Sequence, residues 1–200
     1  FFEPTYADEL AAILRWSFVH LQCEEARESD HDLLNDMRGG SVYLRLTTRR
    51  IAQLQRQIDS DVEGAIIDGG YWLRPPAPDA RLSIVYVGAV GPEALSAHTE
   101  IAHKFPGAGL LAVTSPDRLH RGWLAAQRQR QTTPNGPESA IERLLAPLET
   151  SSQIVTVVDG HPSILSWIGG VYGHPVRALG VERYGESGSL TELYEAYCLD

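Results

Sequence analysis

The stretch LSIVYVGAVGPEALSA, residues 82–97, decides the fold of this 200-residue chain. Its beginning, 82–89, is a nearly continuous apolar run, which is typical of a strand in a sheet that is covered on both faces. A helix is predicted directly after it over 92–105, and a second apolar strand, GLLAVTS, follows over 109–115. A buried strand, a helix and another buried strand in this order predict an α/β fold with a mostly parallel sheet.

The same alternation extends in both directions from this stretch. Further helices are predicted over 7–22, 116–130, 138–148, 163–173 and 189–199, and further strands over 41–47, 71–74, 153–160 and 176–181. The segment 49–63 is polar and predicts a short irregular helix. In the first helix, an apolar stripe at helical spacing is expected to face the core; it consists of Leu10, Ile13, Leu14, Phe18 and Leu21. The proline-rich residues 75–78 cannot continue a sheet ladder and predict a linker.

Composition narrows the class of protein. The chain is 43% hydrophobic and 22% charged, which is typical of a folded domain. Its net charge of −9 argues against nucleic acid as the main partner, and no apolar run approaches the ~20 residues of a membrane span. Cys23 and Cys198 are interpreted as reduced thiols, so we expect a cytoplasmic protein. The chain starts at Phe1 without an initiator methionine or a signal peptide, and we expect a piece of a longer protein.

Ser115, Asp117 and His120 lie close together in the sequence and suggest either a hydrolase cluster or the start of a helix. A serine nucleophile usually lies in a Gly-x-Ser-x-Gly turn, but Val113 and Asp117 occupy the glycine positions here. Serine before proline and aspartate is favourable at a helix N-terminus. We therefore interpret Ser115 as the N-cap of the 116–130 helix, and a small hydrolase remains an alternative.

The segment VVDGHPS, 157–163, offers Asp159 and His161 after a strand, where open α/β sheets place ligands. The same residues are also good turn formers, and the turn is the preferred interpretation. The histidines do not form a His-Glu-x-x-His motif, so no metal site is predicted. The glycine-rich segment 180–189 lacks the Gly-Lys-Ser/Thr arrangement of a phosphate loop.

Several segments, taken in order, resemble the transketolase-like family of thiamine-diphosphate enzymes. FFEPTYADELAAILRW (1–16) and GSVYLRLTTR (40–49) are similar to the last helix and strand of that family's pyrimidine-binding domain. Four later segments resemble its carboxy-terminal domain: LSIVYVGAVGPEALSA, LLAVTSPDRLHRGW, VTVVDGHPSILSWIGG and ALGVERYGESGSLTELYEAYCLD. The greatest similarity is to the homodimeric pyruvate dehydrogenase first component, or a related 2-oxoacid dehydrogenase.

The resemblance implies two regions: residues 1–78 as the end of a pyrimidine-binding domain plus linker, and 79–200 as a three-layer α/β/α carboxy-terminal domain. It also implies thiamine diphosphate and magnesium in the parent enzyme but no cofactor in this chain, because the Gly-Asp-Gly motif and the activating glutamate belong upstream. The family's basic residue for the anionic end of the substrate matches Arg49, or Arg50 if the alignment slips by one; a solvated arginine is the alternative. RRIAQLQRQ lacks the histidine of pyruvate dehydrogenases of this type.

These features together suggest a carboxy-terminal fragment that is not catalytic alone and contributes to dimer assembly. The parent enzyme would deliver its acyl group to a lipoyl acyltransferase component. The alternative is a free-standing interaction or regulatory module with the same fold. Aromatic residues in the carboxy-terminal part predict that 160–200 lies against another domain or a second copy; these residues are Trp123, Trp167, Tyr172, Tyr184, Tyr194 and Tyr197.

Overall fold

A five-stranded sheet forms the centre of the computed structural model, which describes residues 1–22, 40–133, 135–183 and 188–197. The strands are β1 (Gly70–Arg74), β2 (Leu82–Val87), β3 (Gly109–Val113), β4 (Gln153–Val158) and β5 (Val176–Leu179). Their order across the sheet is β1-β3-β2-β4-β5; β2 to β5 are parallel, and β1 pairs antiparallel with β3 at one edge. The predicted α/β class with a mostly parallel sheet is confirmed.

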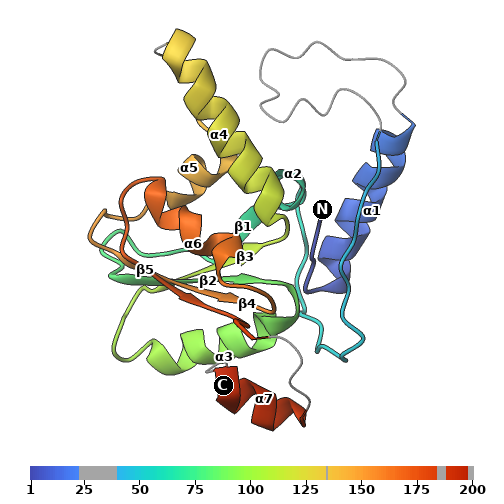
Figure 1. Ribbon diagram of the computed structural model, residues 1–200, viewed down its shortest axis with the longest axis vertical. Coiled ribbons are helices and arrows are strands. Elements are labelled where there is room, and N and C mark those ends of the chain that lie inside the picture. Colours follow the sequence, from blue (N-terminus) through green and yellow to red (C-terminus); the bar gives the residue numbers. More distant parts are fainter. Residues whose placement is uncertain (23–39, 134, 184–187, 198–200) are drawn as a thin grey trace.

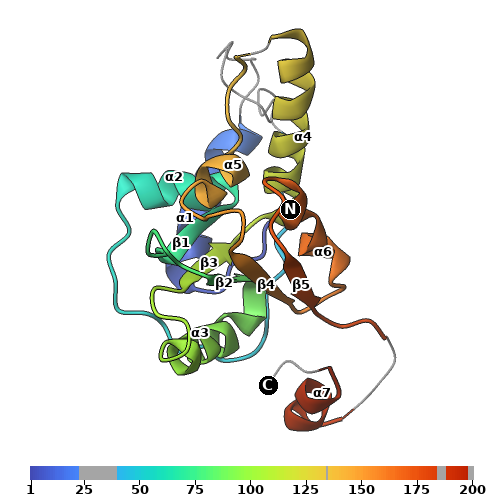
Figure 2. The ribbon, with the colours of Figure 1, turned by 90° about the vertical axis from the view of Figure 1, so that its left-hand side faces the viewer.

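Helices cover both faces of this sheet (Figure 1). The α-helices are α1 (Ala7–Leu21), α2 (Ser60–Asp68), α3 (Gly91–Ile101), α4 (Pro116–Thr132), α5 (Ala140–Leu145), α6 (Ser163–Ser166) and α7 (Leu190–Tyr197). One hydrophobic cluster joins the sheet to α1, α2 and α3, and a second joins the opposite face to α4, α5 and α6. Figure 2, turned by 90°, shows α3 and the α4–α6 group on opposite sides of the strands. These two clusters fill the space between the sheet and the helices on either side of it, so the molecule has the three predicted layers.

The central strand β2 shows why its sequence is apolar at successive positions. Successive side chains of a strand point to opposite faces. Ile84 and Tyr86 pack in the cluster with α1 to α3, whereas Val85 and Val87 pack in the cluster with α4 to α6. All six residues of β2 are buried. The continuous apolar pattern that predicted a doubly covered strand therefore has the expected structural cause.

The first helix agrees with its predicted bounds but not with its predicted buried face. α1 buries Ala12 and Ile13, and burial of Ile13 was predicted from the apolar stripe. Two other residues of the stripe are not buried, because Phe18 is 61% exposed and Leu21 is 48% exposed. The carboxyl half of the helix extends past the residues that cover its beginning, so helical spacing alone did not place these two side chains in the core. An apolar surface at this end of α1, formed by Phe18, Val19 and Leu21, is left open to solvent.

The helix predicted within 49–63 lies later in the chain. Residues 51–59 are not helical, and α2 begins after Asp59, whose carboxylate accepts a hydrogen bond from the Val62 amide at 2.8 Å. The helix ends at Gly69, whose φ of 119° is a left-handed conformation that favours glycine. Capping signals at both ends therefore decide the position of α2, and the segment before it has no regular secondary structure.

The strand predicted over 41–47 is reduced to a single bridge, in which Leu44 is paired with Phe2 in parallel. The Phe2 amide donates to the Tyr43 carbonyl at 2.8 Å, and the Arg45 amide donates to the Phe2 carbonyl at 2.9 Å. The next residue, Glu3, turns away, because its amide donates to the Thr114 carbonyl at 2.7 Å. A strand ladder needs several consecutive paired residues, and the described segment that starts at Phe1 offers only Phe2 as a partner for residues 41–47.

The helix predicted over 163–173 is also shorter than expected. α6 contains four residues and continues as a 3-10 turn over Trp167–Gly170, where two glycines follow each other. Glycine lowers helix stability by about 1 kcal/mol relative to alanine, which is consistent with the break. Within the described residues, no helix has the length and apolar character that a membrane crossing requires.

Candidate functional site

A small pocket lies at the carboxyl end of the parallel strands. Its volume is about 250 Å³. Ala89 comes from the turn after β2, and Asp159 comes from the turn after β4. Two segments from the amino-terminal part of the chain complete the wall, Glu3–Pro4 and residues 45–48. The site therefore joins the sheet to segments that are far away in the sequence.

Arg45 is the central charged group of this pocket. Its Nη1 donates to Glu3 Oε1 at 2.5 Å and to the Asp159 carbonyl oxygen at 2.7 Å. Its Nη2 donates to Asp159 Oδ2 at 3.2 Å. The guanidinium thus bridges the amino-terminal segment and the end of β4, with a carboxylate on either side.

Glu3 is the buried member of this group, with a side chain that is 8% exposed. Burial raises the pKa of Glu3, although the Arg45 guanidinium acts in the opposite direction. The neighbouring Gly88 has a φ of 64°, and a β-carbon at this position would overlap the Glu3 side chain. The turn after β2 therefore requires glycine both for its conformation and for the close approach of Glu3.

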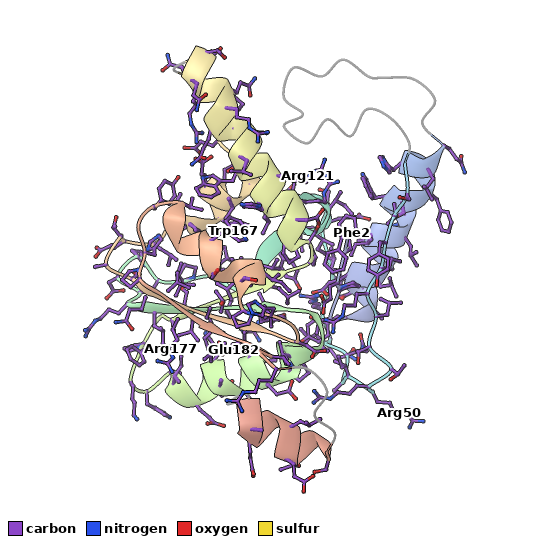
Figure 3. The ribbon with its side chains drawn as sticks, in the orientation of Figure 1. Phe2, Arg50, Arg121, Trp167, Arg177 and Glu182 are labelled. Atoms are coloured by element: carbon purple, nitrogen blue, oxygen red, sulfur yellow. The ribbon has the colours of Figure 1, made fainter. Side chains whose placement is uncertain are left out.

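The residue predicted to bind substrate, Arg49, lies beside the pocket and does not line it. Its guanidinium forms an ion pair with Glu93 in the first turn of α3. Arg50, the alternative position, is exposed, and Figure 3 shows it at the edge of the molecule. The structure thus places Arg49 next to a carboxylate of its own chain.

The cluster of Ser115, Asp117 and His120 is not a catalytic triad. Ser115 precedes α4 at the N-cap position, but its hydroxyl does not cap the helix. The hydroxyl oxygen lies instead 2.5 Å from the Phe1 carbonyl oxygen and 2.8 Å from Asp117 Oδ1, and its single proton can be donated to either acceptor. His120 faces away toward Trp167, with ring centroids 4.7 Å apart. The predicted position of Ser115 is correct, but the predicted capping hydrogen bond is wrong because the amino-terminal segment engages the hydroxyl.

Asp159 and His161 also have separate partners. Asp159 pairs with Arg45, whereas His161 Nδ1 lies 2.7 Å from the Ser163 hydroxyl and accepts from the Ser163 amide at 3.2 Å. His161 and Ser163 are both exposed. This geometry is that of a turn, as the preferred interpretation held. Among the described residues, no group of three or more His, Cys, Asp or Glu side chains is arranged to hold a metal ion.

The aromatic residues expected at an interface partly pack on each other. The rings of Trp123 and Trp167 stack with centroids 5.6 Å apart and an interplanar angle of 22°. Both are half-buried; Figure 3 labels Trp167 near α6, and Tyr172 is 39% exposed. Tyr184, Cys23 and Cys198 lie outside the described residues, as do the side chains of Tyr194 and Tyr197.

A second group of charges lies between α1, residues 51–59 and β1. Glu9, which is 1% exposed, accepts hydrogen bonds from the Thr5 and Tyr6 amides at 2.7 and 3.0 Å and from the Tyr71 hydroxyl at 2.5 Å. Arg56 donates to Asp8 Oδ2 at 2.7 Å and to the Tyr71 hydroxyl at 2.7 Å. Burial raises the pKa of Glu9, and these hydrogen bonds offset part of that effect.

Arg45 and Glu3 were not predicted as site residues. They are separated by 42 positions, and Arg45 and Asp159 by 114, so no local motif contains them. The available signal was that Arg45 is the charged residue within the otherwise apolar and hydroxyl-bearing run SVYLRLT. That signal does not identify a partner.

Comparison with known proteins bears on the fold. No protein-family model matches the chain, and no curated protein matches it. Among solved structures, a split gene transketolase in its inactive beta4 tetramer is similar, with a TM-score of 0.54 and 16% sequence identity. The match covers 99% of this chain and 52% of the transketolase chain, so this chain spans about half of that chain's length. The fold is therefore transketolase-like, as the resemblance in the sequence predicted.

Proposed function

We propose that this chain is the carboxy-terminal part of a transketolase-like thiamine-diphosphate enzyme, either a 2-oxoacid (pyruvate) dehydrogenase or a transketolase relative, and that it is not catalytic alone. The observation that carries this proposal is the match of nearly the whole chain to about half of a split gene transketolase, whose beta4 tetramer is described as inactive. Residues 1–78 would be the end of the pyrimidine-binding domain plus linker, and 79–200 the carboxy-terminal domain.

The pocket at the end of the sheet does not suit the diphosphate of the cofactor. Two carboxylates line it, and both engage its arginine. A diphosphate needs free donors and positive charge, so this pocket supports the proposal that the cofactor is held in another part of the parent enzyme. Thiamine diphosphate and magnesium are accordingly assigned to the parent and not to this chain.

Arg49 is the proposed contact for the anionic end of the substrate. A guanidinium can hold a carboxylate with two parallel hydrogen bonds. In the structure one oxygen of Glu93 accepts a hydrogen bond from Arg49, so a substrate would have to replace Glu93 at this contact. This exchange is chemically balanced, because one carboxylate is substituted for another.

The proposed role of the chain is in assembly of a homodimer, with a lipoyl acyltransferase component as a further partner of the parent in the cytoplasm. Residues 160–200 remain the predicted interface, and the exposed apolar surface of α1, with Phe18, Val19 and Leu21, is proposed as a second one. The alternative function is a free-standing interaction or regulatory module. The upstream reading frame separates the two, because a Gly-Asp-Gly motif and an activating glutamate favour the enzyme.

We expect the isolated chain not to bind thiamine diphosphate tightly, because its sequence lacks the Gly-Asp-Gly motif and because the pocket described above is lined with carboxylates. Isothermal titration calorimetry with magnesium present measures this directly. A matched titration with the full-length protein, if the upstream half carries the cofactor motifs, should show saturable binding. Submillimolar binding by the isolated chain would contradict its assignment as the part without the cofactor.

Replacing Phe18 with aspartate should shift the chain from a dimer to a monomer, because a charge in an apolar contact loses the burial energy and adds a desolvation cost. Light scattering coupled to gel filtration reports the mass. The control is Ala97→Asp, which places the same charge at an exposed position of α3 and should leave the mass unchanged. A wild-type chain that is monomeric at all concentrations would exclude the assembly role of α1.

A further inference from the structure

The pocket lies where the topology of the sheet opens a crevice. The connection that leaves β2 leads to α3 on one face, whereas the connection that leaves β4 leads to α6 on the other face (Figure 1). Because β2 and β4 are neighbours, their two exits diverge and leave space between their carboxyl ends. In open α/β sheets, ligands bind in the crevice at such a switch point. Ala89 and Asp159, which line the pocket, follow these two strands.

The size of the pocket limits the ligand to a small molecule. Its volume of about 250 Å³ is below the range of about 300–1,000 Å³ that is common for drug-sized ligands. Pro4, Leu46 and Ala89 provide apolar wall, and Thr47 and Thr48 provide hydroxyl groups. Five of the eight lining residues are polar or charged, so the pocket suits a small polar ligand better than an apolar one.

The charged residues of the pocket favour a ligand of positive charge. The charged residues that line it are Glu3, Asp159 and Arg45, so negative groups exceed positive ones. Arg45 directs Nη1 and Nη2 at these same two carboxylates, and an anion would have to displace one of them. A cation meets carboxylates that also have oxygens beyond those bonded to Arg45.

We propose that this pocket binds a small organic amine, whose ammonium group hydrogen-bonds the carboxylates of Glu3 and Asp159 while its carbon chain lies against Leu46 and Ala89. An ammonium group has three donors and no acceptor, which suits a site rich in carboxylate and hydroxyl oxygens. The amine would join the amino-terminal segment to the end of β4, as Arg45 does. This inference uses only groups of this chain and does not depend on the proposed enzyme.

The test is calorimetric titration of the whole chain with 1,4-diaminobutane, with xylitol and with inorganic phosphate, at about 50 mM salt so that charges are weakly screened. The diamine should bind saturably, and phosphate should give no binding. Asp159→Asn removes one carboxylate charge without changing the shape of the side chain and should weaken diamine binding about tenfold. Glu149→Gln, an exposed change before the amino end of β4, should leave it unchanged.

Asp159→Asn also removes the ion pair between Asp159 and Arg45, so a second variant is needed that weakens binding without changing any charge. Leu46→Trp keeps every charge but fills the pocket, because Leu46 lines it and is half exposed. It should also weaken binding about tenfold or more. The proposal would be overturned if phosphate or xylitol bound as tightly as the diamine, if the diamine failed to bind, or if both pocket variants bound it as the wild type does.

Discussion

Replacing Arg56 with methionine should lower the free energy of unfolding by about 3 kcal/mol, a value typical of breaking a buried ion pair by removing one partner. Arg56 is 18% exposed and lies between Asp8 and the buried Glu9. Its guanidinium also lies over the rings of Tyr6 and Tyr71, 5.3 and 5.1 Å from their centroids. Methionine keeps much of the volume but removes every donor. Urea denaturation measures the loss.

The pH dependence of this loss identifies its cause. In the wild type, burial raises the pKa of Glu9, so its titration lowers stability as the pH rises from the ordinary glutamate value of about 4.5 through the raised pKa. Without Arg56 this pKa rises further, and the penalty continues to a higher pH. The cost of Arg56→Met should therefore be greater at pH 7 than at pH 4, where Glu9 is protonated in both proteins.

The control for Arg56→Met is Arg15→Met. Arg15 pairs with Glu63 at 2.6 Å, but their side chains are 63% and 38% exposed. Exposed ion pairs contribute between about 0 and 1 kcal/mol. If the two substitutions lowered the free energy of unfolding equally, Arg56 would act as an ordinary surface charge and would not stabilise the buried carboxylate of Glu9.

Ser115→Asp should cost about 3 kcal/mol, although aspartate is among the best N-cap residues. Ser115 is fully buried, and its hydroxyl acts as a donor toward the Phe1 carbonyl or Asp117. An aspartate carboxylate cannot donate and would place a second negative charge beside Asp117 in a buried position. Thermal or chemical unfolding of the variant measures the change.

Two comparisons separate this explanation from simple loss of a cap. Ser115→Ala removes the donor without adding charge and should cost about 1 kcal/mol. Ser189→Asp makes the same change at an exposed position, where the Ser189 hydroxyl accepts from the Glu192 amide at 3.3 Å, and should be within about 0.5 kcal/mol of the wild type. If Ser115→Asp were as stable as the wild type, the hydroxyl of Ser115 would be a cap after all.

The regular elements of the fold were predictable because local patterns determine them. β2 and β3 are apolar at successive positions since both of their faces are covered. The start of α4 was predictable from Ser115 and Pro116, because proline is favourable in the first turn. The local pattern does not show which other segment packs against a helix face or pairs with a strand. For this reason the apolar end of α1 is exposed where burial was predicted, and the strand predicted over 41–47 is a single bridge at Leu44.

The candidate site was predictable only in part. Asp159 was singled out because it follows a buried strand, which is local information, but a turn was the preferred interpretation and a ligand site only the alternative. Its pairing with Arg45 and Glu3 depends on how the amino-terminal segment crosses the end of the sheet, and it therefore requires the three-dimensional arrangement. The hydroxyl of Ser115 was assigned the wrong partner for the same reason, since Phe1 reaches it from a distant part of the sequence.

The antiparallel edge strand β1 has a consequence for synthesis of the chain. Of the strands that the structure describes, the only one that pairs with β1 is β3, because β2 lies on the far side of β3. Since β1 precedes β3 in the chain, β1 leaves the ribosome before its partner has been synthesised. At about 5–20 residues per second, roughly 2–8 s separate the two strands. During this interval an unpaired strand is open to pairing with other nascent chains. β1 is short, and Pro75 and Pro76 follow it directly; without amide donors, they prevent this exposed edge from extending.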